Sequence, residues 1–217
     1  MWELPDFWVA VKMQEPLKRM FDLVIALAIG VLLLPLLLVI AVLVKIDSRG
    51  PAYFIQNRLG LAGTVFPMYK FRTMVQNAEQ MGTGLFSYED DPRITRVGRI
   101  LRLTSLDELP QLINVIKGDM SIVGPRPPVT YELGNYADFS PELKARFTVK
   151  PGVTGLAQLS GRNDLTWDRK LVFDSEYIRK YRTYGIAYDI CLIVKTIWVV
   201  LSMRNVIERP ANNNERL

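Results

Sequence analysis

The sequence predicts a mostly α-helical protein with a small β-hairpin, in which one apolar helix enters a membrane and amphipathic membrane-surface helices pack on a compact domain. Three observations predict this fold class. Residues 23–44 are a run of 22 uncharged and almost wholly aliphatic residues. Segments 53–58 and 65–72, rich in aromatic and β-branched residues, flank a glycine-containing turn. Apolar residues at 106–116 recur at helical spacing and stop near Gly118.

The composition excludes several classes of active site. The chain has 217 residues, a formal net charge of +5, no histidine and one cysteine, Cys191. Without histidine, neither Ser-His-Asp and Cys-His triads nor HExxH metal sites can form. One cysteine allows no internal disulfide and no cysteine-rich zinc site. Chemistry must therefore depend on carboxylates, basic groups, hydroxyls or a hard cation such as Mg²⁺, and the positive charge favours an anionic partner.

The apolar run at 23–44 is long enough to cross the hydrocarbon core of a membrane, because a continuous helix of that length spans roughly 30 Å. It is too long for a signal peptide, and Lys45 follows it without a small-residue cleavage site. Basic residues flank it on both sides, from Lys18 to Arg58, and Pro35 interrupts its middle. A re-entrant hairpin that returns to the same face accounts for both features. A proline-kinked single-pass helix is the alternative.

These features divide the chain into four segments. Residues 1–17 are expected to lie at the membrane interface, and 18–46 to form a membrane helix broken near Pro35. Residues 47–205 are expected to form the compact domain, and 206–217 a polar tail.

Three features of the compact domain bear on its surface and loops. Residues 124–128 (GPRPP) predict a stiff loop, because proline restricts both itself and the residue before it. Residues 188–203 are apolar but interrupted by charges, which suits a membrane-surface or core helix better than a span. In the second strand of the hairpin, Lys70 and Arg72 lie two residues apart and are expected to share a face.

The densest polar cluster is the run 102–111, RLTSLDELPQ. Adjacent carboxylates, Asp107 and Glu108, can provide a nucleophile beside a Mg²⁺ ligand for phosphoryl chemistry. The structural alternative is a capping box, Ser105-x-x-Glu108, whose acidic residues complement a helix N-terminus. A second candidate is Arg126, which lies between two prolines and offers a planar fork of donors suited to phosphate. A solvated surface arginine is the alternative there.

A collinear series of motifs runs through residues 17–200. The motifs are KRMFD at 18–22, YKFRTM at 69–74, DPRIT at 91–95, TSLDELPQ at 104–111, GDMSIVGPRP at 118–127, KPGVTG at 150–155 and SGRN at 160–163. In this order they resemble the bacterial sugar transferase family, the monotopic polyprenyl-phosphate phosphoglycosyl transferases. Any one motif could arise by chance, whereas the whole series is highly specific.

The resemblance implies transfer of a sugar 1-phosphate from a UDP-sugar to undecaprenyl phosphate, with release of UMP. This reaction starts the assembly of an exopolysaccharide, capsule, O-antigen or glycoconjugate. The resemblance further implies that Asp107 is the nucleophile and forms a covalent phosphosugar intermediate. It implies that Glu108, together with Asp107, holds Mg²⁺ against the diphosphate. Which sugar is transferred stays open.

Five basic residues are implied to bind the substrate phosphates. They are Lys70, Arg102 and Arg126, with Arg72 and Arg162 added by motif membership alone. Their charge and that of Mg²⁺ would offset the repulsion between an aspartate and an anionic diphosphate. Because an aspartate is already ionised at neutral pH, the missing histidine is no obstacle to this chemistry.

The resemblance also implies the re-entrant arrangement, with a catalytic domain on the cytoplasmic face of the bacterial inner membrane. Relatives commonly place a serine before the helix-breaking proline, whereas this chain has Leu34. Membrane lipids are expected partners. Nucleic acid is not, because the aromatic and basic surface motifs of nucleic-acid binders are absent. A homodimer is compatible with the motifs.

Overall fold

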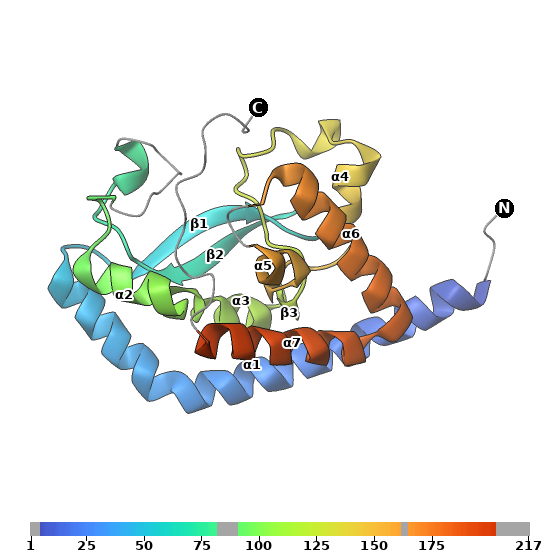
Figure 1. Cartoon of the computed structure of the whole chain (residues 1–217), viewed down its shortest axis with the longest axis horizontal. Helices are drawn as coiled ribbons and strands as arrows, with labels where there is room; N and C mark the ends of the chain where they lie inside the picture. The colour runs from blue at the N-terminus through green and yellow to red at the C-terminus, as the bar shows by residue number, and fades with distance from the viewer. Residues whose placement is uncertain (1–4, 82–90, 162–164, 203–217) are drawn as a thin grey trace.

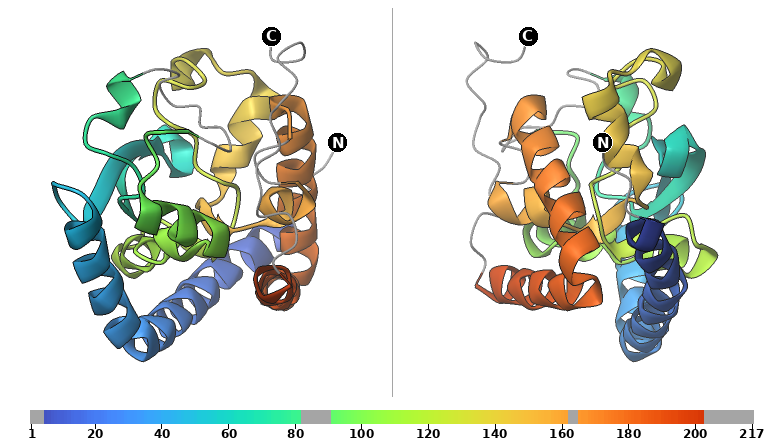
Figure 2. Two further views of the ribbon diagram at one scale, coloured as in Figure 1. Left: turned by 60° about the vertical axis from the view of Figure 1, so that its left-hand side comes forward. Right: turned by 90° about the vertical axis from the view of Figure 1, so that its right-hand side faces the viewer.

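The computed structural model describes residues 5–81, 91–161 and 165–202, with side chains described from Glu15. Its longest element is α1 (Pro5–Asp47), which bends in the stretch that contains Pro35 (Figures 1 and 2). Helical structure continues through the proline, so the interruption expected near Pro35 is a bend and not a gap in the helix. Proline removes one intrahelical hydrogen bond and its ring displaces the preceding turn, which kinks a long helix without ending it.

The two arms of α1 pack on different parts of the molecule. The first arm lies along α3 (Gln111–Lys117) and β3 (Ser121–Val123), and the second arm lies along α2 (Arg96–Thr104). Buried apolar residues of the second arm join a small cluster with α2 and the end of β2. That cluster consists of Ile40, Val44, Phe71 and Leu101. The helix thus runs beneath the domain, and its N-terminal end projects beyond it (Figure 1).

The predicted β-hairpin is confirmed. Strands β1 (Tyr53–Leu59) and β2 (Val65–Phe71) are antiparallel, and Tyr53 pairs with Phe71 at the open end. A short 3-10 turn at 61–63 joins them, and one face of β2 supplies Phe66 and Met68 to the core. The strand ends at Phe71, and the next residue, Arg72, still donates its main-chain N–H to the carbonyl of Ala52 at 2.9 Å.

The predicted amphipathic helix at 106–116 is two elements. Residues Leu106–Glu108 form a 3-10 turn, and α3 begins only after Pro110. Its predicted end is confirmed, because Gly118 has a φ of 95° and its N–H closes the last turn of α3. The catalytic candidates therefore lie in the connection between α2 and α3 rather than inside a helix.

A parallel strand pair that the sequence patterns did not predict lies at the centre of the domain. Strand β3 pairs with β4 (Gly152–Thr154), and α4 (Pro141–Ala145) lies in the connection between them. The backbones approach closely here, since a Cβ on Gly152 would lie 2.0 Å from the nitrogen of Gly124. Strand β3 leads directly into the proline-rich loop that carries Arg126.

Three helices complete the fold. They are α5 (Leu156–Ser160), α6 (Trp167–Tyr184) and α7 (Ile186–Leu201). The apolar segment predicted from 188 is thus a helix, α7. The main core joins α1, β2, α3, β3, α6 and α7, and its most buried members are Ala26, Val115, Met120, Val123, Tyr177 and Leu192. The predicted tail 206–217 and Arg162 lie outside the described residues.

Candidate active site

Glu108 is the centre of the candidate site. Lys70 Nζ donates to its Oε1 at 2.9 Å, and Arg126 Nη2 donates to the same oxygen at 2.6 Å. Arg126 Nη1 reaches Oε2 at 3.2 Å, so the guanidinium binds both carboxylate oxygens. The hairpin supplies Lys70, the loop after β3 supplies Arg126, and the turn between α2 and α3 supplies Glu108. The fold therefore brings three of the predicted site residues into direct contact.

Asp107 has a different environment from its neighbour. Among the described residues, no hydrogen bond engages its carboxylate, which is half-buried. Burial, reinforced by the charge of Glu108, raises the pKa of Asp107 to about 6, although Lys70, Arg102 and Arg126 oppose the shift. Burial would also raise the pKa of Glu108, but Arg126 and Lys70 hold it well below its usual range. The Glu108 carboxylate is therefore neutralised by two cations, whereas the Asp107 carboxylate keeps its lone pairs available.

The predicted capping box at Ser105 is wrong. Ser105 has a φ of 58° and ends α2, whereas an N-cap residue needs extended backbone. Its side chain makes no capping hydrogen bond, and the Glu108 carboxylate turns instead to Lys70 and Arg126. The left-handed residue reverses the chain sharply after α2, and this reversal presents Asp107 and Glu108 to the hairpin.

Arg102 lies at the edge of this cluster. It comes from the last turn of α2, and its Nε donates to the hydroxyl of Thr73 at 2.9 Å. Its charge lowers the pKa of Asp107, so its guanidinium acts on the carboxylate electrostatically. Two of the predicted basic residues, Lys70 and Arg126, contact Glu108 directly. The third, Arg102, acts on the cluster through the effect of its charge on the Asp107 carboxylate.

Arg72 does not join the cluster. Its side chain is buried and donates to the main-chain oxygens of Val44, Ser48 and Arg49, which end α1 and begin the following turn. The side chain of Arg72 thus reaches the end of α1, whereas Lys70, two residues earlier, reaches Glu108. The last carbonyls of a helix lack intrahelical partners, and a guanidinium fork satisfies several at once.

Arg58 is a neighbour of the site that sequence reasoning had assigned only to the basic flank of the apolar run. Its Nη1 donates to the carbonyl of Pro127 at 3.0 Å, and its Nη2 donates to Gln56 Oε1. Burial, followed by the charge of Arg126, lowers the pKa of Arg58 to about 10. The available signal was its place in β1, beside the strand that carries Lys70.

A second arginine holds the other side of the Arg126 loop. Arg146 Nη2 donates to the carbonyl of Arg126 at 2.7 Å and lies 3.0 Å from Asp174 Oδ2. Arg146 and Asp174 are both buried, and burial raises the pKa of Asp174 to about 6. Because Arg58 and Arg146 hold two successive carbonyls, the guanidinium of Arg126 is aimed at Glu108 by a fixed loop.

The donor set suits one kind of metal site. The described residues contain no group of three or more metal-binding side chains. Asp107 and Glu108 alone could not form a protein cage, but Mg²⁺ is commonly bound through one or two carboxylates, with water and substrate phosphates as its other ligands. These two residues therefore fit a Mg²⁺ ion that is shared with a bound diphosphate.

Chemically, the cluster combines an available carboxylate with three nearby cations. Lys70, Arg102 and Arg126 surround Asp107 and Glu108, so an incoming polyanion would meet positive charge on several sides. With a pKa near 6, Asp107 is mostly ionised at neutral pH and is more basic than an ordinary aspartate. The arrangement suits attack of Asp107 on an electrophilic phosphorus.

Comparison with known proteins gives a consistent result. Residues 13–203 match the model of a family described as bacterial sugar transferase. The undecaprenyl-phosphate galactose phosphotransferase of Salmonella typhimurium is 44% identical over 199 residues, covering 85% of this chain and 40% of the relative. The chain therefore spans about two fifths of that relative's length.

Two further relatives are matched over more of their own length. The UDP-glucose:undecaprenyl-phosphate glucose-1-phosphate transferase of Caulobacter vibrioides is 41% identical over 193 residues, covering 87% of this chain and 71% of the relative. The exopolysaccharide production protein ExoY of Sinorhizobium fredii is 41% identical over 201 residues, with 86% of both chains covered. The names of the Salmonella and Caulobacter proteins specify different sugars, galactose and glucose.

Proposed function

The chain belongs to the bacterial sugar transferase family, and from this premise we propose that it transfers a sugar 1-phosphate from a UDP-sugar to undecaprenyl phosphate, releasing UMP. The reaction would start the synthesis of an exopolysaccharide or related bacterial glycan. The observation that carries this proposal is the contrast between the two carboxylates. Glu108 is held by Lys70 and Arg126, and Asp107 is left available beside them.

In the first step, an oxygen of the Asp107 carboxylate attacks the phosphorus that bears the sugar. The bond between that phosphorus and the oxygen bridging the two phosphates breaks, and UMP leaves with the electron pair. A phosphosugar is then bonded to Asp107. Lys70, Arg102 and Arg126 lower the repulsion between the carboxylate and the diphosphate. The ion pairs of Glu108 keep Lys70 and Arg126 positioned before substrate arrives.

In the second step, an oxygen of undecaprenyl phosphate attacks the same phosphorus and displaces Asp107. The product is undecaprenyl diphosphate sugar, and the carboxylate is regenerated, so no general base is consumed. When bound between Asp107, Glu108 and the phosphates, Mg²⁺ would supply charge neutralisation. Two successive displacements at one phosphorus explain how a site without histidine can run the reaction.

The lipid acceptor requires contact with a membrane, and α1 supports such contact. Its stretch Glu15–Asp47 is long and apolar enough to cross a bilayer, and 11% of its most apolar window is buried. Leu32 is 77% exposed, which would be costly in water. We propose that α1 enters the membrane as a re-entrant helix bent near Pro35, with the candidate site at the cytoplasmic face.

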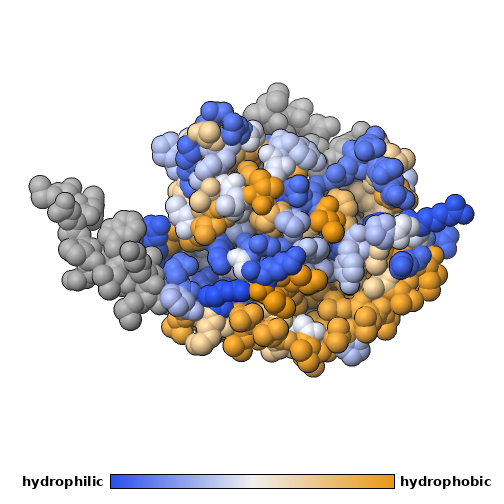
Figure 3. All heavy atoms as spheres, turned by 180° about the vertical axis from the view of Figure 1, so that it is seen from behind, coloured by the Kyte–Doolittle hydropathy of each residue, from blue (hydrophilic) through white to orange (hydrophobic). Residues whose placement is uncertain are grey.

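Other helices extend the same apolar surface. Exposed apolar residues outside α1 include Ile100 and Leu103 on α2, Ile113 and Ile116 on α3, and Ile190, Val194, Ile197 and Trp198 on α7. Apolar residues gather along one side of the molecule, below a band of polar residues (Figure 3). This distribution supports α2, α3 and α7 as helices that rest on the bilayer surface.

Trapping of the intermediate would test the proposal. The purified protein with Mg²⁺ and a UDP-sugar carrying a labelled sugar phosphate, without lipid acceptor, should release about one UMP per enzyme and retain the label covalently. Addition of undecaprenyl phosphate should discharge the label to lipid and restore turnover. A panel of UDP-sugars, starting with UDP-galactose and UDP-glucose, would identify the donor.

Asp107→Asn is the critical variant. It should show neither the burst of UMP nor the covalent label. Because the folded protein disfavours the charged form of Asp107, the amide should not lower thermal stability, so lost activity would not reflect lost folding. Undiminished turnover by Asp107→Asn would overturn the nucleophile assignment. UMP formation that requires lipid from the first turnover would argue for a single direct displacement.

A further inference from the structure

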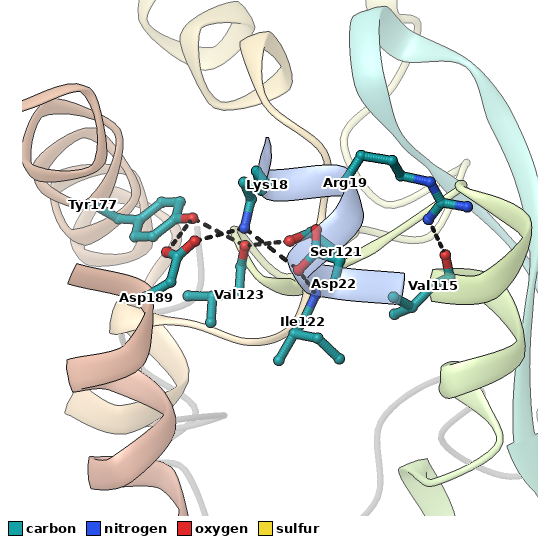
Figure 4. A network of polar contacts seen from close by, with 9 residues as sticks. All are labelled: Lys18, Arg19, Asp22, Val115, Ser121, Ile122, Val123, Tyr177 and Asp189. Atoms are coloured by element: carbon teal, nitrogen blue, oxygen red, sulfur yellow. Dashed lines mark hydrogen bonds and ion pairs between the residues drawn. The ribbon is translucent and has the colours of Figure 1, made fainter. Parts of the chain in front are cut away.

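A buried charged cluster joins the first arm of α1 to the domain, well away from Glu108. Lys18 on α1 lies 2.6 Å from Asp189 on α7 and 3.7 Å from Asp22, one helical turn further along α1 (Figure 4). The hydroxyl of Tyr177 on α6 lies 3.0 Å from Asp189 Oδ1 and can donate its one proton there or to the main chain of β3. All four side chains are buried, and the Lys18 ammonium also faces the ring of Tyr181 at 5.2 Å.

The same cluster holds the main chain of β3. The Tyr177 hydroxyl lies 2.9 Å from the carbonyl of Val123, and the N–H of Ile122 donates to Asp22 at 3.1 Å. Burial and the nearby Asp189 raise the pKa of Tyr177 well above its usual value, so the hydroxyl stays protonated as a donor. Val123 is the last residue of β3, three residues before Arg126.

Arg19, next to Lys18 on α1, holds the second segment that leads to the site. Its guanidinium donates to the carbonyls of Val115 and Ile116, in the last turn of α3 (Figure 4). The Val115 carbonyl also accepts from the N–H of Gly118 at 3.1 Å, and a cation is favourable at this end of a helix. Helix α3 follows directly from the turn that carries Asp107. The first arm of α1 therefore bonds to both β3, which leads to Arg126, and α3, which follows the turn that carries Asp107.

Buried ion pairs contribute little net stability compared with apolar residues of similar size, because each charge loses its hydration. Two of these buried side chains, Asp22 and Tyr177, bond to two successive residues of β3, and Lys18 and Asp189 link Asp22 to Tyr177. These contacts make the geometry of that strand specific. We infer that Lys18, Arg19 and Asp22 of α1, with Tyr177 and Asp189, form an α1 clamp that positions the Arg126 loop relative to the Asp107 turn. Its members are positioning residues, since none of them contacts Glu108.

The α1 clamp makes the positions of Arg126 and Asp107 depend on how the apolar helix α1 packs on the domain. Displacement of α1 from the domain would release the N–H of Ile122, which donates to Asp22, and the carbonyls at the end of α3 together. The relation between Arg126 and the catalytic pair would then loosen, and misplacement of a catalytic group by about 1 Å can lower a rate about a hundredfold. The expected loss of rate rests on the proposed function. The expected loosening of the Arg126 loop does not.

Tyr177→Phe tests the α1 clamp with a matched control. The change removes one hydroxyl and keeps the ring that packs in the core. Tyr181→Phe is the control, since its hydroxyl on the same helix is also buried but has no hydrogen-bond partner among the described residues. Hydrogen exchange followed by mass spectrometry should show at least about tenfold faster exchange in peptides spanning 119–128 for Tyr177→Phe only. Unchanged exchange would overturn the clamp, whatever the reaction proves to be.

Enzyme kinetics supply a second measurement, because replacing a residue with a purely structural role should not change kcat selectively. Tyr177→Phe should lower kcat by about tenfold, with KM for the UDP-sugar within about twofold of the wild-type value. In an Arg126→Lys background the same change should cost less than about twofold, because Tyr177 acts through Arg126. Equal losses in both backgrounds would contradict this route. Absence of UMP release from the wild-type protein would instead count against the proposed function, with the exchange result still deciding the clamp.

Discussion

Asp107 and Glu108 are adjacent in the chain, yet their surroundings push their pKa values in opposite directions. Arg126 and Lys70 hold Glu108 ionised, whereas burial makes Asp107 a stronger base than an ordinary aspartate. Pairs of carboxylates with divergent pKa values often divide two tasks between them. Here Glu108 organises the cations, and Asp107 keeps its oxygens available for reaction.

The pKa of Asp107 predicts an acid limb in the pH profile. We expect kcat/KM for the UDP-sugar to fall as the pH drops through about 6, because protonation removes the nucleophile. Below that value the loss should approach about tenfold per pH unit. Initial rates of UMP release between pH 5 and 8, at low UDP-sugar concentration, would measure it. A profile that stays flat down to pH 5 would contradict the assignment.

Asp107 should affect folding stability in the opposite direction, so that stability falls where activity rises with pH. Its pKa is raised from 3.8 to about 6, so the folded chain binds this proton more tightly than the unfolded chain. The stability from Asp107 is therefore fully present below pH 3.8 and is lost as the pH rises through 6. Ionisation favours reaction and disfavours folding at this position, which is the usual relation between activity and stability in a catalytic site.

At the scale of elements, Arg72 shows how a motif residue can serve the fold rather than the substrate. It follows Lys70 in the same motif, but it ties the end of α1 to the end of β2. A second arginine, Arg19, does the same for α3. Two helix ends of this protein are therefore held by guanidinium groups from distant elements.

Arg72→Ala should destabilise the protein and leave substrate binding unchanged. The variant loses hydrogen bonds to three carbonyls at the end of α1, a loss of about 2–3 kcal/mol when buried acceptors are left without partners. Thermal unfolding would measure the loss, and KM for the UDP-sugar should stay within about twofold. Arg126→Ala is the contrast, since it should raise KM or lower kcat with a smaller change in stability. A KM effect of Arg72→Ala as large as that of Arg126→Ala would restore Arg72 as a substrate ligand.

Local patterns predicted the elements that depend on local chemistry. The aromatic and β-branched segments on either side of residues 60–63 predicted the hairpin, and Gly118 predicted the end of α3. The β3–β4 pair could not be predicted in this way, because each strand has three residues and its partner lies about thirty positions away. Ser105 was misjudged because Ser-x-x-Glu also fits a capping box, and only the reversal after α2 places it in the left-handed region.

The candidate site was predictable in part for the same reason. Motif order brought Lys70, Asp107, Glu108 and Arg126 together, and the structure places Lys70 and Arg126 on Glu108. Arg58 had only its place in β1 as a signal, and the Arg146–Asp174 pair had none, since Arg58 and Arg146 hold carbonyls of a distant loop. Arg72 likewise lies two residues from Lys70 in the motif, and its partners at the end of α1 are set by the packing of a distant helix.

At the scale of the whole molecule, if α1 enters a membrane as proposed, its bend decides which side each end occupies. In the proposed arrangement both arms return to one face, and the α1 clamp holds the first arm to the domain. The second arm packs through Ile40 and Val44, but this packing opposes straightening only weakly in a bilayer, because lipid is as apolar as the residues it would replace. Pro35 is therefore expected to carry much of the preference for a bent helix.

Pro35→Leu should shift α1 toward a straight, membrane-crossing helix. Proline inside a helix costs about 3 kcal/mol relative to a good helix former, so its replacement favours the straight form by a comparable amount. A cysteine at position 4, with the exposed Cys191 changed to serine, would report the location of the N-terminus through an impermeant maleimide added to sealed cells. The label should be protected with Pro35 present and reactive in a larger fraction of molecules with Pro35→Leu. Pro16→Leu is the matched control, because Pro16 lies in the same helix but outside the apolar run, and its replacement should leave the label protected. Labelling from outside with Pro35 present would overturn the re-entrant arrangement, whereas protection in both variants would show that the α1 clamp and second-arm packing maintain the bend without the proline.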